Sequence, residues 1–338
     1  MTATIQLISP VDGRVYAERS YADSTQIEQA LTAAATAQAQ WKRRPLSERA
    51  AFCSAVVDAM LAMKTDIVRE LAWQMGRPVR FGAGELRGFE ERARHMIAIA
   101  PEALAAIEPT PVSGLRRHIQ RDPLGTVLVI APWNYPYLTA VNTVIPALMA
   151  GNSVILKHAS QTLLVGERFA EAMARANLPE GLFHNLLLDH SQTAAIIGSG
   201  RIHQVNFTGS VGAGKAMETA ATGRFLGVGL ELGGKDPAYV RADADLDHAV
   251  ENLVDGSFFN SGQSCCAIER IYVDKQIYPA FIERFAALTR QYVLGNPLDE
   301  ATTLGPLVTP AAADFVRGQI AVALAQGAKA LIEPQAFP

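Results

Sequence analysis

The chain contains little cysteine, no strong excess of charge of either sign and no long apolar run. Three cysteines occur in 338 residues and two are adjacent, so we expect no disulfide framework and a cytoplasmic location. The 33 acidic and 30 basic residues give a formal net charge of −3, which favours neither nucleic acid nor a membrane as a partner. The most apolar stretches, 125–130 and 141–149, are too short to span a bilayer.

Two further absences narrow the class of protein. The start, Met-Thr-Ala-Thr-Ile-Gln, lacks the basic and apolar regions of a signal peptide, so none is expected. The seven histidines show no pair at metal-ligand spacing and no Cys-x-x-Cys motif occurs, so we expect no metal site. What remains is a composition of 49% hydrophobic and 19% charged residues, typical of a globular enzyme with two domains.

From residue 126 onward, short apolar runs alternate with helical patterns. This alternation predicts an α/β fold with a parallel sheet covered on both faces, which binds ligands at the carboxyl ends of its strands. Strands are expected at 126–130, 153–156, 182–188, 204–208 and 225–232, and helices at 140–150, 163–174 and 215–221.

Other segments lie outside this alternation. A capping box at 23–26 predicts the start of one helix, and a second helix is expected after Pro45. The polar piece 109–123 contains a Ser-Gly turn and is either a protruding hairpin or a plain linker. The apolar run 330–332 indicates a short strand near the end of the chain.

A glycine-rich turn at 209–214 joins an expected strand to an expected helix. Such a turn presents backbone N–H groups and the positive end of a helix dipole to an anion. Its spacing, Gly-Ser-Val-Gly-Ala-Gly, is neither the dinucleotide fingerprint nor a P-loop. A tight connection that binds no ligand is an equally good interpretation.

Cys265 follows the small, flexible run Gly262-Gln263-Ser264 and is the candidate nucleophile. A free thiol has a pKa of about 8.5 and needs a local positive field to ionise at neutral pH. Cys266 is the obvious rival, but adjacent side chains diverge, so we do not expect both thiols in one pocket. Buried packing is the alternative for this pair, and it is the favoured interpretation of Cys53.

A carboxylate and an amide complete the parts needed for acyl chemistry through a thioester. Glu231 ends an apolar strand just before two glycines, where burial would raise its pKa and suit it to act as a general base. A salt bridge with Lys235 is the alternative. Asn134 directly follows a strand, and its amide could donate to an oxyanion or simply form a turn.

Taken together, these segments resemble the NAD(P)-dependent aldehyde dehydrogenase superfamily. The order and spacing of the matching motifs hold from about residue 8 to the end. The matches are Pro-Trp-Asn-Tyr-Pro at 132–136, Ile-Leu-Lys at 155–157, Phe-Thr-Gly-Ser at 207–210, Glu-Leu-Gly-Gly-Lys at 231–235 and Gly-Gln-Ser-Cys at 262–265. Gly-Asn-Pro-Leu-Asp at 295–299 and Leu-Gly-Pro-Leu at 304–307 resemble segments that follow in the family.

The resemblance implies an architecture and an assembly. It implies a Rossmann-like dinucleotide-binding domain at 1–232, with a subunit-bridging hairpin at 107–123, and an α/β catalytic domain at 233–338. Family members continue well past the position of residue 338, so this catalytic domain is expected to be incomplete at its C-terminal side. A homodimer or homotetramer is expected for the full-length form.

The resemblance also implies a reaction, the oxidation of an aldehyde to a carboxylic acid with NAD or NADP. Cys265 would attack the aldehyde carbon, while the Asn134 amide and the Cys265 N–H hold the oxyanion. Hydride transfer would leave a thioester, and Glu231 would activate the water that releases the acid. The implied cofactor-binding residues are Trp133, Lys157, Ser160, Gly209, Ser210 and Gly233.

Two departures from the family pattern bear on specificity. Members that prefer NAD often carry a glutamate three residues after the lysine; the residue here is Ser160, so acceptance of NADP is expected. Members that act on succinate semialdehyde often carry an arginine eight residues after the asparagine; the residue here is Asn142, with Tyr135 and Tyr137 upstream. Without a cation at that position, a neutral or weakly polar aldehyde is expected.

Two other functions compete with aldehyde oxidation. A nucleotide-binding fragment of such an enzyme, truncated and catalytically impaired, would keep the cofactor fold alone. A cysteine hydrolase would need a histidine to activate the thiol, and none lies in or beside the cysteine segment.

Overall fold

The computed structural model describes residues 3–337, and the chain divides into two compact units. The first unit comprises Glu18–Lys64 and Gly84–Glu231, with the N-terminal residues up to Gln6. The second comprises Leu7–Ala17, Thr65–Ala83 and the chain from Leu232 onward. The domain limits expected at 232 and 233 stay a prediction.

A five-stranded sheet forms the centre of the first unit, in the order β5-β4-β3-β6-β7. Strand β3 pairs in parallel with both β4 and β6, and β4 pairs in parallel with β5, so the predicted α/β class is confirmed. All six residues of β3 are buried, as expected for a central strand covered on both faces. The strands are β3 (Thr126–Ala131), β4 (Ser153–His158), β5 (Phe183–Asn185), β6 (Gln204–Gly209) and β7 (Gly227–Leu232).

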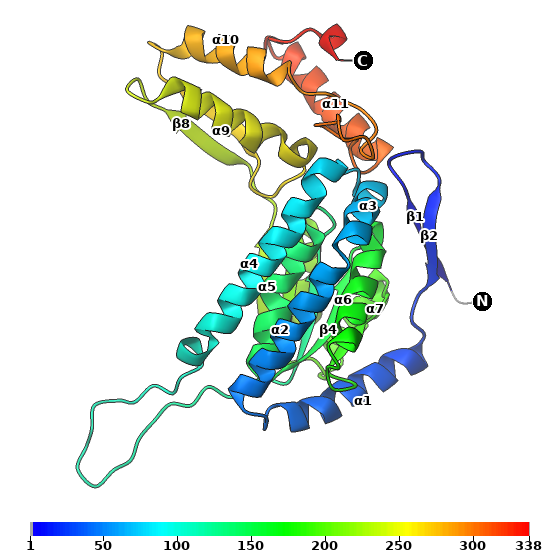
Figure 1. Ribbon diagram of the computed structural model, residues 1–338, viewed down its shortest axis with the longest axis vertical. Coiled ribbons are helices and arrows are strands. Elements are labelled where there is room, and N and C mark those ends of the chain that lie inside the picture. The colour runs from blue at the N-terminus through cyan, green and yellow to red at the C-terminus, as the bar shows by residue number, and fades with distance from the viewer. Residues whose placement is uncertain (1–2, 338) are drawn as a thin grey trace. The chain divides into compact units, whose positions relative to one another are not determined.

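The helices of the first unit pack around this sheet (Figure 1). The capping box at Asp23 and Gln26 is present and starts α1, as predicted. Fully buried Trp41, Phe89 and Phe169 fill the space between helices and sheet. The helices are α1 (Ser24–Trp41), α2 (Leu46–Ala62), α4 (Val79–Ala103, whose first residues belong to the second unit), α5 (Pro136–Met149), α6 (Leu163–Arg175), α7 (His190–Gly198) and α8 (Val211–Ala221).

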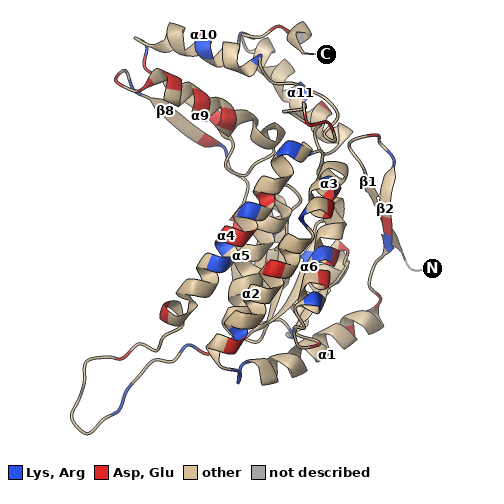
Figure 2. Ribbon diagram, in the orientation of Figure 1, with Lys and Arg blue, Asp and Glu red and all other residues tan. Residues whose placement is uncertain are grey.

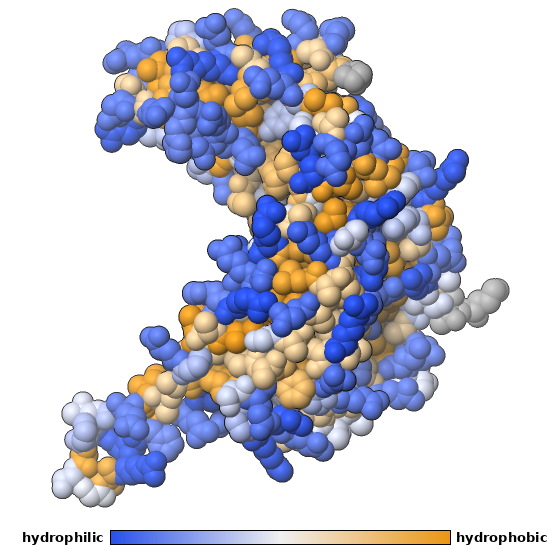
Figure 3. All heavy atoms as spheres, viewed as in Figure 1, coloured by the Kyte–Doolittle hydropathy of each residue, from blue (hydrophilic) through white to orange (hydrophobic). Residues whose placement is uncertain are grey.

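The polar piece before β3 is a long two-armed loop that protrudes from the first unit (Figure 1). Its arms meet in an antiparallel pair in which Ile107 and Ile119 exchange both backbone hydrogen bonds, at 2.9 and 2.8 Å. Apolar residues lie on the surface of this loop (Figure 3), among them Val112 and Leu115. The subunit-bridging role of the loop stays a prediction.

The second unit contains a small parallel sheet of β8 (Asp236–Val240) and β9 (Ile268–Val273), connected through α9 (Leu246–Phe258). With α10 (Tyr278–Thr289), these elements enclose an apolar core built on Val240, Val250, Val254 and Phe281. Asp245 caps α9 by accepting the N–H groups of Asp247 and His248. The remaining elements of the chain are β1 (Thr4–Ile8), β2 (Val15–Ser20), α3 (Lys64–Met75), α11 (Pro310–Ala325) and the 3-10 turns η1 (Ser160–Thr162), η2 (Phe259–Gly262) and η3 (Pro334–Ala336).

Three expected elements differ from the structure. The strand expected at 330–332 is wrong, because these residues form a bend after α11 without a neighbouring strand. The strand expected at 182–188 is limited to β5, and β7 begins two residues later than expected. Phe225 lies in the left-handed region with φ 53° and is fully exposed, so it cannot continue β7 backward.

Within residues 3–337, no helix is both long and apolar enough to cross a membrane.

Candidate active site

The order of the strands places a topological switch point between β3 and β6. The chain runs from β3 to β4 and β5 on one side and then returns to β6 on the other side of β3. Trp133 and Asn134 follow β3 directly, and Gly209 and Ser210 come at the end of β6. Open α/β sheets bind ligands at such a point, outside the carboxyl ends of the strands. The structure therefore brings both predicted motifs to the expected edge.

Asn134 lies in a short turn between β3 and α5. Its Oδ1 accepts the backbone N–H of Tyr135 at 3.1 Å. The amide is thereby oriented, and the donors that an oxyanion needs are carried by Nδ2, the other branch of the side chain.

Two buried side chains from other elements hold the start of α5, directly after Asn134. The side chain of Tyr135, at the N-cap, does not cap the helix. Glu85 of α4 caps the helix instead, and its Oε1 accepts the N–H groups of Tyr137 at 3.0 Å and Leu138 at 2.9 Å. We call Glu85 and His158 the α5 clamp.

His158, the second residue of the clamp, ends β4. Its Nε2 lies 3.3 Å from the carbonyl oxygen of Pro136, and its Nδ1 lies 3.1 Å from the hydroxyl of Thr162. Burial lowers the pKa of His158 to about 4, so the ring is neutral at pH 7. A neutral ring satisfies both contacts if Nε2–H donates to Pro136 and Nδ1 accepts from Thr162.

The cofactor residues predicted on β4 and after it share one pocket of about 340 Å³ in the first unit. Lys157 and Ser160 line it together with Asp189, His190 and Ser191 from the start of α7. Burial lowers the pKa of Lys157. The side chain of Asp189 accepts the N–H of Gln192 at 2.7 Å and so caps α7. The resemblance implied the first two residues; the last three were missed, although Asp189 and Gln192 form a capping box of the same kind as that at 23–26.

The glycine-rich turn after β6 is built for close approach. A Cβ at Gly209 would lie 2.6 Å from the ring of Phe207, so only glycine fits at this position. Ser210 is the N-cap of α8, and its hydroxyl accepts the N–H of Ala213 at 3.2 Å.

Glu231 lies near the end of β7 with an exposed side chain, so the burial expected for this carboxylate is absent. The alternative salt bridge is also wrong, because Lys235 pairs with Glu269. The two glycines after Glu231 differ in their surroundings. A Cβ at Gly233 would meet nothing within 4 Å, whereas one at Gly234 would lie 2.8 Å from the carbonyl oxygen of Cys265. The segment that follows Glu231 therefore runs against the cysteine.

Cys265 is exposed and follows a strained loop of the second unit. Asn260, Ser261 and Gly262 have φ values of 54°, 59° and 72°, a run of left-handed residues of which only the last is glycine. Each left-handed residue other than glycine costs on the order of 1–3 kcal/mol and needs support from its surroundings.

That support comes from two segments of the same unit, one at Arg77 and one at 305–308. Buried Arg77 donates from Nε to Asn260 Oδ1 at 3.3 Å. The hydroxyl of Ser261 donates to the carbonyl of Gly305 at 2.8 Å, and the N–H of Val308 donates to Gln263 Oε1 at 2.9 Å. Segment 304–307, singled out in the sequence without a role, thus braces the cysteine loop.

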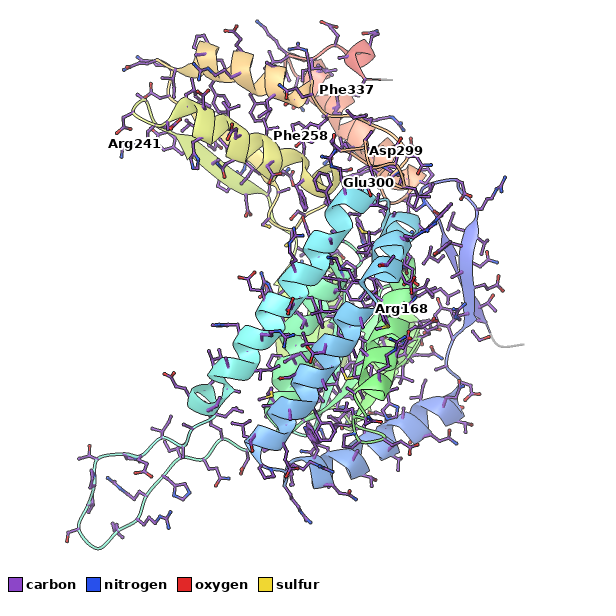
Figure 4. The ribbon with its side chains drawn as sticks, viewed as in Figure 1. Arg168, Arg241, Phe258, Asp299, Glu300 and Phe337 are labelled. Atoms are coloured by element: carbon purple, nitrogen blue, oxygen red, sulfur yellow. The ribbon has the colours of Figure 1, made fainter. Side chains whose placement is uncertain are left out.

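The start of the loop is anchored by the apolar core of the second unit. The ring of Phe258 at the end of α9 packs against Phe285 and Tyr292, with centroid distances of 6.2 and 5.6 Å (Figure 4).

The environment of the Cys265 thiol does not favour its ionised form. Burial raises the pKa of Cys265, and the adjacent Cys266 raises it further by its charge and by a hydrogen bond between the two side chains. The backbone N–H of Cys265 acts in the opposite direction. Because the two thiols contact each other, the expected divergence of adjacent side chains is wrong at this position. Cys53 is fully buried, as predicted.

A cation lies beside Asn142, the position at which the sequence itself has no cation. Arg92 of α4 donates from Nη1 to Asn142 Oδ1 at 3.3 Å. Among residues 3–337, Arg92 makes no ion pair, so its charge faces only a neutral amide. Tyr137 is fully buried and stacks on Phe169, so it belongs to the core and does not line an open pocket.

In the part of the chain that the structure describes, no cluster of three or more His, Cys, Asp or Glu side chains could hold a metal ion.

These features define an α/β protein with a ligand edge at the switch point of a parallel sheet and an accessible thiol in a braced loop. The profile of the aldehyde dehydrogenase family matches residues 1–336, and the chain belongs to this family.

Individual relatives and a solved structure agree with this assignment. The chain is 33% identical over 325 residues to succinate semialdehyde dehydrogenase [NAD(P)+] Sad of Escherichia coli, which covers 96% of this chain and 70% of that protein. It is 33% identical over 332 residues to a succinate-semialdehyde dehydrogenase [NADP(+)] of Mycolicibacterium paratuberculosis, with 96% of this chain and 69% of the relative covered. The crystal structure of PnpE in complex with nicotinamide adenine dinucleotide matches at a TM-score of 0.93 and 29% identity, over 97% of this chain and 68% of that one.

Proposed function

We propose that this member of the family oxidises an aldehyde to a carboxylic acid with NAD(P)+ through a thioester on Cys265. The balanced reaction converts an aldehyde, water and NAD(P)+ into a carboxylate, NAD(P)H and protons. The observation that carries the proposal is the exposed Cys265 in a braced loop, packed against the glycine segment that follows Glu231.

Each proposed catalytic residue has one chemical task. The Cys265 sulfur bonds to the aldehyde carbon, and the Asn134 Nδ2 and the Cys265 N–H hold the resulting oxyanion. Glu231 takes a proton from the water that cleaves the thioester, and its exposed position gives it access to solvent. Trp133 is the proposed wall beside the reacting groups.

The cofactor, when bound, supplies the hydride acceptor. Lys157 and Ser160 would hold the adenosine ribose in the 340 Å³ pocket, and Ser210 with Gly209 would bind the pyrophosphate at the start of α8. The open space around Gly233 fits close approach of a ligand. Ser160 has no carboxylate to repel a 2′-phosphate, and the carboxylate of Asp189 in the same pocket caps α7, so we propose that NADP is accepted.

The cofactor proposal is tested by comparing kcat/KM for NAD and NADP in the wild type and in S160E. The substitution is expected to lower use of NADP at least tenfold relative to NAD. A strong NAD preference already present in the wild type would contradict the proposal.

For the substrate, we propose an aldehyde with a distal carboxylate, such as succinate semialdehyde, in place of the neutral aldehyde first expected. Arg92 supplies a cation without a carboxylate partner beside Asn142, two turns of α5 beyond Asn134. Asn142 lies in the second turn of α5, and the six helical steps from Pro136 to Asn142 rise about 9 Å along the helix axis. Two relatives carry the name succinate-semialdehyde dehydrogenase.

The substrate is tested with succinate semialdehyde and butanal, which share a four-carbon chain and differ in the carboxylate. R92Q should raise KM for succinate semialdehyde at least tenfold and leave butanal within about twofold, as expected for a lost charged hydrogen bond. An equal change in KM for both substrates would show that Arg92 does not recognise the distal carboxylate.

The reaction itself is tested by rapid mixing of the chain with NADP and aldehyde. A burst of NADPH absorbance is expected from the wild type and C266S, and none from C265S. Bound cofactor without a burst in the wild type would favour the nucleotide-binding alternative. A cytoplasmic location and assembly as a homodimer or homotetramer belong to the same proposal.

A further inference from the structure

The first unit has a pocket of about 650 Å³ lined by basic residues at the base of the protruding loop. Lys42 and Arg43 line it from the end of α1, Arg49 from the first turn of α2, and Arg121 from the returning arm of the loop. We call this the cationic pocket. Asp122 is the one acidic residue in its lining. Figure 2 shows basic segments on the loop arm and beside the lower end of α2.

The cationic pocket lies at the opposite edge of the sheet from the candidate active site. Pro123 and Ala150 line it, and each stands three residues before a strand, β3 and β4 respectively. Lys157 and the Asn134 turn lie at the far ends of these two strands. A strand of six residues spans roughly 17–20 Å, and the two pockets share no lining residue, so the dinucleotide site does not explain this one.

The four cations are not neutralised by carboxylates. None of them forms an ion pair within residues 3–337. The buried Nε of Arg49 has no hydrogen-bond partner, and burial lowers the pKa of this guanidinium. Asp122 accepts a hydrogen bond from Gln120 at 3.1 Å rather than from a basic residue.

Helix dipoles account for only part of this charge. The C-termini of α1, α4 and α5 lie beside the pocket, each equivalent to about −0.5 charge, and the start of α2 contributes about +0.5. These partial charges remove about one unit from a net charge of about +3, so roughly two positive charges are left without compensation.

We propose that the cationic pocket binds a small phosphate-bearing anion, at a site separate from the cofactor. A phosphate group carries about −1.5 to −2 charge at neutral pH and three acceptor oxygens, which matches the residual charge and the guanidinium donors that line the pocket. The volume falls within the range of roughly 300–1,000 Å³ found for small-molecule sites. Ordering Arg121 by such an anion would tie the base of the protruding loop to α1 and α2.

Titration calorimetry with inorganic pyrophosphate tests the proposal, using the wild type and the exposed pair variant R43Q/R121Q. The pair variant should bind pyrophosphate at least tenfold more weakly, with an unchanged thermal midpoint in the absence of the anion. R116Q, which removes another exposed arginine of the same loop, and K157Q, which alters the cofactor pocket, should both bind as the wild type does.

Four outcomes would overturn the proposal. One is the absence of pyrophosphate binding by the wild type. A second is an equal loss in R116Q, which would assign the effect to general surface charge. A third is a loss confined to K157Q, which would place pyrophosphate in the cofactor pocket. The fourth is tighter binding of citrate than of pyrophosphate, which would point to carboxylates instead of phosphate.

Discussion

At the scale of single residues, the reactivity of Cys265 depends on a neighbour that the proposed mechanism does not use. Cys266 raises the pKa of the Cys265 thiol through its charge and a hydrogen bond, in addition to the effect of burial. The hydroxyl of Ser264 contacts the Cys266 sulfur at 3.3 Å. Burial is the largest cause of the raised pKa, and the second cysteine adds to it, so both reduce the thiolate fraction of Cys265.

We expect the alkylation rate of Cys265 by iodoacetamide to rise with pH and to level off only above the ordinary thiol pKa. A raised pKa reduces the thiolate fraction at neutral pH, so the rate gains most on the alkaline side. In C266S one cause of the raised pKa is lost, and the profile should shift toward lower pH. Alkylation at Cys265 is followed by mass spectrometry, with C265S as the blank. A profile that stays in place in C266S would contradict the coupling.

At the scale of elements, the start of α5 is positioned by residues far away in the sequence. Glu85 belongs to α4 and His158 to β4, and both contact the backbone of α5 within four residues of Asn134. An error in this turn would displace the proposed oxyanion donor without touching the cofactor pocket.

We predict that E85A lowers kcat at least tenfold while KM for the cofactor stays within about twofold. The variant leaves two N–H groups without their acceptor and should lower the free energy of unfolding by about 1–3 kcal/mol. E85Q retains an amide oxygen and should recover part of kcat. E91Q, an exposed change on the same helix, is the control, and steady-state kinetics with denaturant unfolding are the measurements. A parallel rise of the cofactor KM in E85A would indicate a general loss of structure instead.

A second element, segment 304–307, is predicted to be essential for the cysteine loop. A Cβ at Gly305 would lie 1.9 Å from the carbonyl oxygen of Gly76, whereas one at Gly318 of α11 meets nothing within 4 Å. G305A should therefore destabilise the protein by about 1–3 kcal/mol or more, and G318A should stabilise it by about 0.5–1 kcal/mol because alanine favours a helix. Thermal unfolding of both variants is the measurement, and equal midpoints would contradict the prediction.

Features that depend on local sequence were predictable, whereas those that depend on contacts between distant segments were not. Strands β3, β4 and β6 were predictable because their apolar runs are short and bounded by turn residues. Asn134, Lys157 and Ser210 were placed at the strand ends because a parallel sheet gathers those ends on one edge. Packing between segments far apart in sequence is not encoded by any local pattern. It determines the exposure of Glu231, the contact between Arg92 and Asn142, and the α5 clamp. Residues 330–332 show the converse, since an apolar run forms a strand only where another strand can pair with it.

At the scale of the whole molecule, the described chain exposes apolar side chains on α11. No residue of this helix is buried, and Val316, Ile320 and Leu324 repeat every four residues with exposed fractions of 40%, 55% and 46%. A stripe of this spacing is typical of a helix face that packs against another surface.

We expect the wild-type chain to self-associate with increasing concentration, as measured by sedimentation velocity. I320K/L324K should reduce this association, because it places two charges in the apolar stripe. Q319K/Q326K adds the same charge at exposed polar positions, one in α11 and one at its C-cap, and should leave association unchanged. A wild type that sediments as a monomer at every concentration tested would contradict the prediction.

The run of left-handed residues before Cys265 has a consequence for how this protein tolerates change. Two of its members, Asn260 and Ser261, are held in a conformation that glycine adopts freely, and their side chains are tied to neighbouring segments. A variant with glycine at both sites would relax the backbone and would also lose the side-chain hydrogen bonds of Asn260 and Ser261. Its melting temperature should change little while its turnover falls, so selection for thermostability alone would overlook the residues on which the thiol depends.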